Sequence, residues 1–536
     1  MSFTSFNFLV FLAAVIVVYY LVPKKYQWCV LLVASYGFYL STGIDHVFYI
    51  IGTTLFTYGA GRWMQRIRDD FQTHLDTLGS DVTKEEKREM KKAVSAKVRR
   101  IQVAAVVVNL GVLICLKCLN FFIGNINNVL AFFTWDASIP MVNILVPLGL
   151  SYYTFNSVGY LVDVGRGKIS AEKNLGKFAL FVSFFPSIVQ GPLFRYGDVG
   201  TQLQQEHKLE YNNLKFGAQL ILWGFFKKLM IADRVASVAM TVFAPGFVDY
   251  TGSHVFVGVL AYSFQIYCDF SGGTDITRGV AQMMGINLPM NFERPFFATS
   301  MADFWRRWHM SLGAWMREFV FYPIMLSKGV TSLSKKFRKR WGAYAGKMVP
   351  SVAAPMVVFT LIGIWHGLTW QYITNGLYNA LLISSSVALA PVYQKMTEKL
   401  HIKTESFGFR LFQMLRTFVL LCFSRIIVKA PSLGDALKMI KSLFTGWDMN
   451  FLLGRDGKIF TDYGITERDL LVLVFSIGLL FIVGVLQERG MKIRETLSKQ
   501  HLVIRWGIIL TLLLLIFVFG IYGPNYDARS FIYGGF

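Results

Sequence analysis

Long apolar stretches with few charges dominate this chain, and they constrain its fold more than any other feature. Of its 536 residues, 54% are hydrophobic and only 16% are charged, whereas a typical soluble domain is about 25% charged. A helix needs roughly 20 mostly apolar residues to cross a bilayer. Inside the bilayer only helices and closed barrels satisfy their own backbone groups. The pattern therefore predicts an all-α polytopic membrane protein, and we expect one membrane domain over residues 1–536.

Hydropathy places the expected spans along the whole chain. Several are shorter than the roughly 20 residues that a full crossing needs, so some are expected to be tilted, extended or re-entrant. No internal or inverted repeat of the transporter kind is visible. The expected spans cover residues 6–22, 27–42, 47–61, 101–123, 141–162, 177–193, 216–232, 253–270, 350–365, 371–391, 411–428, 468–486 and 503–522.

Basic residues predict the orientation. The formal net charge is +22, but the basic residues cluster between apolar spans, which is the positive-inside pattern. Anionic lipid headgroups explain them better than nucleic acid, so no nucleic-acid partner is expected. Lys24 and Lys25 follow the first span, which places the N-terminus outside. Residues 62–100 hold eleven Lys or Arg and seven Asp or Glu, and are expected to form a basic cytoplasmic connector.

Cysteine usage gives no sign of a metal site. Cys115 and Cys118 form a CxxC within an apolar segment. A structural zinc site needs two further ligands, and no second pair is present. We interpret both as small packing residues. Hydrolase, P-loop and dinucleotide motifs are also missing, so direct group transfer assisted by a base is the simplest chemistry.

One histidine, His366, lies in the apolar segment LIGIWHGLTW. An ionisable group in a membrane span is a functional candidate by default, and histidine exchanges a proton near neutral pH. Gly363 and Gly367 allow close backbone approach, while Trp365 and Trp370 supply apolar walls. We expect a desolvated, neutral ring that acts as a general base on a hydroxyl. A plain hydrogen bond to a neighbouring helix is an equally supported alternative.

A second histidine, His309, lies in DFWRRWHMSLGAW. Asp303, Arg306 and Arg307 are spaced i, i+3 and i+4, which predicts an ion pair within one helix. The segment can rim an active site. The composition alone favours an interfacial anchor with snorkelling arginines, because its tryptophans are typical of an aromatic belt: Trp305, Trp308 and Trp315.

Irregular sequence surrounds these histidines. Residues 271–330 mix Gly, Pro, Asn, Arg and Trp, and such backbone is tolerated at membrane depth only inside protein or beside a wet cavity. We therefore place the catalytic core at 267–370. Asp269 ends an apolar span and is expected to form a structural ion pair with Arg278 or an arginine of the His309 segment. The patch FFPSIVQGPLFRYGD (184–198) is expected to line a tunnel or to be a kinked helix end.

At these residues the chain resembles a known family, the membrane-bound O-acyltransferases, and within it the alginate O-acetylation branch. The resemblance is carried by the run from Tyr267 to Ile324, by GIWHG (363–367), by QGPLFR (190–195) and by the closing SFIYGGF. It implies a ring of transmembrane helices around a tunnelled centre. Acceptor and acyl donor would reach a histidine from opposite sides. The turn after FVFYPI departs from the alginate proteins, which leaves the donor class open.

The resemblance also implies roles. His366 corresponds to the catalytic histidine and His309 to the second motif histidine. The donor would be acetyl-CoA or another acyl thioester, with no bound cofactor and no metal. The implied partners are membrane lipids, a glycan acceptor, and an extracytoplasmic acetyltransferase or an acyl-carrier protein. The implied location is the bacterial plasma membrane. The expected tunnel lining comprises Gln190, Gly191, Arg195, Asn291, Trp305, Arg306, Trp308 and Trp365.

Three functions remain open at this point. Acetyl transfer toward a cell-surface or secreted polysaccharide is favoured, because the D-alanylation proteins are usually shorter. D-alanyl transfer to teichoic acid is the enzymatic alternative, and a transporter or lipid-binding scaffold is the alternative without catalysis. For acetyl transfer we expect a narrow passage that ends at His366. A bulky residue at Gly191 is expected to block it without unfolding the protein.

Overall fold

The structure is a computed structural model that describes residues 2–78, 83–135, 137–144, 146–246, 251–455 and 457–523. Over these residues the chain is helical, and its only β pairing is an isolated bridge between Phe292 and Trp308. The all-α prediction is confirmed. The closing SFIYGGF lies outside the described residues.

Contacts divide the chain into two compact units. Unit 1 comprises residues 1–218 and 277–289, and unit 2 comprises residues 219–276 and 290–536. The helices of unit 1 are α1 (Phe6–Leu21), α2 (Gln27–Leu40), α3 (Ile44–Leu78), α4 (Lys84–Phe132), α5 (Leu150–Arg166) and α6 (Leu175–Ser183). Two helices contribute to both units: α7 (Tyr211–Phe225) and α9 (Gly252–Met283).

Unit 2 holds both candidate histidines. A π-helical turn (Phe226–Ala232) leads into its first complete helix, α8 (Asp233–Val242). The helices nearest these histidines in the sequence are α10 (Met301–Arg307), α11 (Met310–Met316), α12 (Tyr322–Met325), α13 (Lys328–His366) and α14 (Trp370–Ala388). The longer helices that follow are α15 (Ala390–Lys399), α16 (Phe407–Lys429), α17 (Leu433–Ser442), α20 (Glu467–Glu488), α21 (Ile493–Ser498) and α22 (Leu502–Phe519). Two single-turn helices, α18 (Met449–Leu452) and α19 (Lys458–Thr461), lie between α17 and α20.

Six helices are long and apolar enough to cross a membrane within the described residues. They are α4, α9, α13, α16, α20 and α22. The pair α14 and α15, bent by 57°, makes a seventh if it is one broken span. The chain is therefore a multi-pass membrane protein. Exposed apolar side chains on α20 and α22, among them Phe481 and Phe517, fit lipid-facing surfaces.

Two predicted spans are wrong in their extent. The span expected at 141–162 is helical only from Leu150, after Gly149 adopts a positive φ of 71°. The span expected at 177–193 ends as a helix at Ser183. Pro186 and Pro192 lie in the non-helical stretch that follows. Proline has no backbone N–H to donate to a helix, so hydropathy alone overstated this segment.

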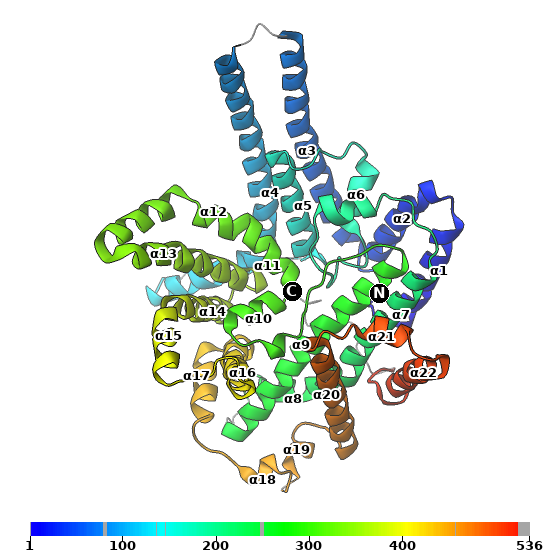
Figure 1. The fold of residues 1–536 in the computed structure, drawn as a ribbon, viewed down its shortest axis with the longest axis vertical. Helices are drawn as coiled ribbons and strands as arrows, with labels where there is room; N and C mark the ends of the chain where they lie inside the picture. Colours follow the sequence, from blue (N-terminus) through cyan, green and yellow to red (C-terminus); the bar gives the residue numbers. More distant parts are fainter. Residues whose placement is uncertain are drawn as a thin grey trace. The chain divides into compact units, whose positions relative to one another are not determined.

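The expected basic connector includes the C-terminal part of α3 and the N-terminal part of α4. These two helices run side by side as a hairpin (Figure 1). A capping box begins α4: Thr83 accepts from the Glu86 backbone, and the Glu86 carboxylate accepts from the Thr83 backbone. Charged side chains such as Glu89 and Lys92, which are 3.6 Å apart, are largely exposed there. The hairpin end therefore offers accessible positions for labelling.

We expect this hairpin end to lie in the cytoplasm. A cysteine at Glu89, in a variant that lacks the five native cysteines, should react with an impermeant maleimide only after cells are opened. Ser80, in the same connector, lies outside the described residues. A cysteine beside Ser2 should be labelled in intact cells. Labelling of position 89 in intact cells would contradict the positive-inside orientation.

Candidate active site

A short antiparallel contact between two irregular segments places His309. The backbone N–H of Glu293 donates to the Arg307 carbonyl at 2.9 Å, and that of Met310 donates to the Asn291 carbonyl at 3.0 Å. Between these bonds lies the Phe292–Trp308 bridge. Helix α10 ends at Arg307 and α11 begins at Met310, so His309 occupies the break between two seven-residue helices.

His309 has a strained backbone and a buried ring. Its φ of 47° and ψ of 50° are left-handed, which is uncommon for a residue other than glycine and costs of order 1 kcal/mol or more. The side chain is only 2% exposed. Its Nδ1 lies 3.2 Å from Oδ1 of Asn291. Its Nε2 is buried and has no hydrogen-bond partner among the described residues. Backbone strain beside an unsatisfied ring nitrogen is typical of a functional site.

The surroundings of His309 favour the neutral ring. Burial, and next the charge that His366 can carry, hold the pKa of His309 well below its ordinary value. Phe270 meets the ring edge-on, with the ring centroids 4.8 Å apart, and Trp365 lies 6.0 Å away. These surroundings favour the neutral form of His309 over the imidazolium.

These contacts correct two expectations. The His309 segment is not an interfacial anchor, because His309 and Trp308 are 2% and 3% exposed and Trp308 belongs to the core of unit 2. The turn between α10 and α11 directs both rings inward, which composition cannot reveal. The second expectation was that His366 would be desolvated. Its side chain is only partly buried, so His309 is the more desolvated of the two histidines.

His366 is the last residue of α13, where this helix meets α14. A Cβ added to Gly363 would collide with the backbone carbonyl of Tyr372, and one added to Gly376 would lie 2.5 Å from the Phe359 carbonyl oxygen. Glycine at both positions allows the two helices to cross closely, as expected for Gly363. The His366 ring lies 4.5 Å from the Trp365 ring and 6.1 Å from the Tyr372 ring, centroid to centroid.

Two cavities meet at a shared wall, and each has one of the two histidines in its lining. The larger, about 320 Å³, is lined by His309, Gly313 and Arg317 among others. The smaller, about 40 Å³, is lined by His366, Asn375 and Arg425 among others. Residues common to both linings form the wall: Trp305, Trp308, Phe359 and Ile362.

A polar network holds the wall in place. The indole N–H of Trp305 donates to Oδ1 of Asn379 at 3.1 Å. The amide nitrogen of Asn379 donates to Oγ of Ser424 at 3.3 Å, and that hydroxyl donates to Oδ1 of Asn375 at 2.6 Å. The Phe359 ring packs edge-on against Trp305, with centroids 5.1 Å apart. Sequence reasoning named Trp305 but missed Asn375 and Asn379, whose signal was two amides spaced i, i+4 in one helix.

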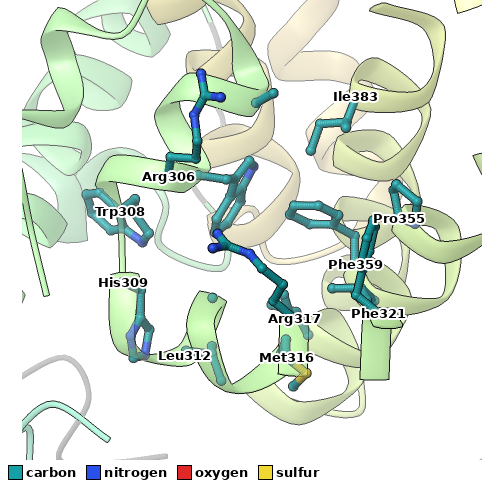
Figure 2. Close-up of a pocket in the computed structure, with 15 residues that line it drawn as sticks. Arg306, Trp308, His309, Leu312, Met316, Arg317, Phe321, Pro355, Phe359 and Ile383 are labelled. Carbon is teal, nitrogen blue, oxygen red and sulfur yellow. The ribbon is translucent and has the colours of Figure 1, made fainter. Parts of the chain in front are cut away.

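The larger cavity is apolar with two cationic side chains (Figure 2). Figure 2 shows Phe359, Phe321 and Pro355 on one side and Trp308 with His309 on the other, with the Arg317 side chain extending into the space between them. Arg306 also lines this cavity and keeps most of its side chain in solvent. No residue in the lining of either cavity has a carboxylate side chain.

Both predicted acidic residues form ion pairs. The carboxylate of Asp303 lies 3.4 Å from Arg306 and 3.2 Å from Arg307, as the helical spacing indicated. Asp269 pairs with Lys228 at 2.6 Å, a partner that sequence reasoning did not name. Lys228 is also 2.8 Å from Asp233. Removing one partner of such a buried pair is strongly destabilising, so this network stabilises unit 2.

The Gln190–Arg195 patch belongs to unit 1, whereas the residues that line the two cavities belong to unit 2. Arg195 forms an ion pair with Asp163, and Gln190 is fully buried. The expectation for Gly191 is wrong, because a Cβ there would collide with the Cα and Cβ of Ser187. A bulky residue at this position would distort the backbone rather than merely fill a passage.

No cluster of three or more His, Cys, Asp or Glu side chains with metal-binding geometry occurs in the described ranges. The described cysteines are all free: Cys115 is exposed and Cys118 is buried.

Comparison with known proteins places this geometry in context. A family model described as MBOAT, membrane-bound O-acyltransferase family, matches residues 168–424, which include both histidines. A protein of Pseudomonas syringae pv. tomato named probable alginate O-acetylase AlgI is 30% identical over 450 residues, which cover 84% of this chain and 76% of the relative.

Two relatives of other named activities match less of the chain. The peptidoglycan O-acetyltransferase of Helicobacter pylori is 27% identical over 371 residues, covering 64% of this chain and 64% of the relative. The teichoic acid D-alanyltransferase of Bacillus subtilis is 33% identical over 250 residues, covering 46% of this chain and 60% of the relative.

Proposed function

Because this chain belongs to the membrane-bound O-acyltransferase family and is a multi-pass membrane O-acyltransferase, we propose that it moves acetyl groups from a cytoplasmic thioester toward a polysaccharide of the cell surface or a secreted polysaccharide. Membership of this family sets aside the transporter and scaffold alternatives. One observation carries the proposal further: two cavities of different character share a wall, and each has a candidate histidine in its lining.

The larger cavity suits the donor. Its volume of about 320 Å³ lies at the low end of the ~300–1,000 Å³ typical of ligand pockets, and its lining is mainly aromatic and aliphatic. A thioester on a thin pantetheine arm is largely neutral along the arm and anionic at its phosphate end. Arg306 and Arg317 supply the positive charge that attracts such a phosphate.

The smaller cavity suits the acceptor hydroxyl. At about 40 Å³ it accommodates a few non-hydrogen atoms, since one water needs ~10–15 Å³ of such volume. A hydroxyl at the tip of an acceptor can enter, whereas a long acyl chain cannot. His366 and the two asparagines offer hydrogen-bond partners there.

The reaction then needs only a base. In the proposed mechanism the neutral ring of His366 takes the proton of the acceptor hydroxyl. At the same time the hydroxyl oxygen attacks the thioester carbonyl carbon. The new C–O bond forms, the C–S bond breaks, and the thiolate leaves and receives the proton. General-base assistance of this kind contributes roughly 10²–10⁴-fold.

Acetyl transfer is favoured over D-alanyl transfer by the extent of the match. The alginate O-acetylase relative covers 84% of this chain, against 46% for the D-alanyltransferase. The proposed partners follow from this choice: an extracytoplasmic acetyltransferase that completes the transfer, and a glycan acceptor. A D-alanyl donor would instead require an acyl-carrier protein.

Donor preference tests the proposal. Purified protein in lipid bilayers is expected to release the thiol from acetyl-CoA when a hydroxyl acceptor is present. Palmitoyl-CoA should react at least ~100-fold more slowly, because a long acyl chain does not fit beside the pantetheine arm in the larger cavity, which has a volume of about 320 Å³. Efficient palmitoyl transfer would favour a lipid acyltransferase. Turnover with D-alanyl carrier protein, but not with acetyl thioesters, would favour the D-alanylation alternative.

A further inference from the structure

The buried side chain of Asn291 has an orientation that the backbone fixes. Its Oδ1 lies 3.1 Å from the backbone nitrogen of Ser311 and 2.8 Å from the Ser311 hydroxyl oxygen. A backbone N–H can only donate, so the amide oxygen, and not the amide nitrogen, must face Ser311. Asn291 is only 1% exposed, and its Nδ2 has no partner among the described residues.

This orientation determines the tautomer of His309. The same Oδ1 lies 3.2 Å from Nδ1 of His309. An amide oxygen is an acceptor only, so the ring nitrogen that faces it must carry the hydrogen. In a neutral imidazole only one nitrogen carries a hydrogen. Nε2 is therefore the acceptor, and it is the buried atom that has no partner.

We infer that Asn291 is a positioning residue that locks His309 in the Nδ1–H tautomer, so that Nε2 accepts a hydrogen bond from the ligand. A neutral histidine in this tautomer can receive a hydrogen from an amide, a hydroxyl or a released thiol. It has no hydrogen at Nε2 to donate to the oxyanion that forms on the thioester carbonyl. The inference rests on the proposed function only for the identity of the ligand.

The electrostatic surroundings support a neutral ring in this role. The groups around His309 are Asn291, Ser311, Phe270 and Trp365, together with His366, whose positive form repels a proton on His309. No carboxylate contacts the ring among the described residues, so nothing there stabilises an imidazolium.

A direct readout of the tautomer tests the inference without relying on turnover. Solid-state NMR of the full-length protein with ¹⁵N-labelled histidine distinguishes the two neutral tautomers, and the His309 signals are those that disappear in His309→Gln. We expect Nδ1 to be protonated and Nε2 to be bare in the wild type. In Asn291→Leu the His309 signals should shift toward the Nε2–H form. A wild-type ring with Nε2–H would overturn the inference even if the enzyme is fully active.

Two variants connect the tautomer to catalysis. Asn291→Leu is expected to lower kcat/KM by about 10–100-fold, the loss that removal of an orienting partner typically causes. Ser311→Ala is the matched control: it keeps the Ser311 N–H that orients Asn291, and should stay within a few-fold of wild type. Folding of each variant is checked by its thermal unfolding midpoint.

Asn291→Asp separates positioning from a merely structural role. It preserves size and the acceptor oxygen, but its negative charge should raise the pKa of His309. Protonated His309 cannot accept at Nε2, so activity should fall on the acid side at a higher pH than in the wild type. A folded Asn291→Asp variant with an unchanged pH profile, or a folded Asn291→Leu variant with full activity, would refute the positioning role. A wild-type protein that fails to transfer acetyl groups, yet shows the Nδ1–H tautomer, would refute only the proposed function.

Discussion

His366→Ala is expected to lower acyl transfer by about 10²–10⁴-fold, the usual contribution of a general base, while expression and membrane insertion stay unchanged. His366 lines the smaller cavity and lies at the end of α13, where its ring is only partly buried. Its removal therefore costs little packing energy. The measurement is acetyl transfer by the purified variant at several pH values, together with its thermal unfolding midpoint.

A matched control is His74→Ala, because His74 lies on an exposed turn of α3 within unit 1. This variant should keep full activity. Wild-type rates for a folded His366→Ala protein would remove His366 from the mechanism. His309, whose Nε2 lacks a partner, would then be the remaining candidate for the base.

The sequence was most informative where residues close together in the chain determine the local structure. The apolar runs of α4, α20 and α22 lie close to where hydropathy places them, because each is long and lightly charged. The Asp303 ion pairs followed from helical spacing alone. The resemblance also extends to the two histidine motifs, whose segments line neighbouring cavities.

The sequence was least informative where function depends on residues distant along the chain. Asn291 contacts His309 across 18 positions that include helix α10, and Lys228 contacts Asp269 across 41 positions. Neither pairing has a periodic signal. Hydropathy also averages over a window, so it missed the end of α6 at Ser183. The burial of His309 depends on one left-handed residue, which no composition rule predicts.

The wall between the cavities bears directly on how transfer occurs. A donor carbonyl held beside His309 and a hydroxyl held beside His366 are separated by Trp305, Trp308, Phe359 and Ile362. For the oxygen to attack, the acyl group must reach the edge of this wall. With the donor in the larger cavity, as we propose, the volume of that cavity would limit the reaction, and a substitution that fills it should be as damaging as loss of the base.

Gly313→Leu is expected to lower acyl transfer by roughly 100-fold or more, since a misplacement of about 1 Å can already cost that much. Gly313 lines the larger cavity, and a Cβ there would meet only the Trp305 carbonyl oxygen, at 3.8 Å. The added side chain should enter the cavity without forcing the backbone, unlike a substitution at Gly191. Leucine also favours the helix more than glycine does, so the unfolding midpoint should not fall.

The matched control is Gly329→Leu, at an exposed position of α13 where a Cβ would meet nothing within 4 Å. It shares the change in residue type but lies outside both cavities. If Gly313→Leu is folded and transfers acetyl groups at the wild-type rate, the donor does not use the larger cavity. If Gly313→Leu and Gly329→Leu lose activity equally, the loss comes from the change in helix composition. Loss in Gly313→Leu alone, with binding of the acetyl thioester weakened, is the result that a donor site beside His309 requires.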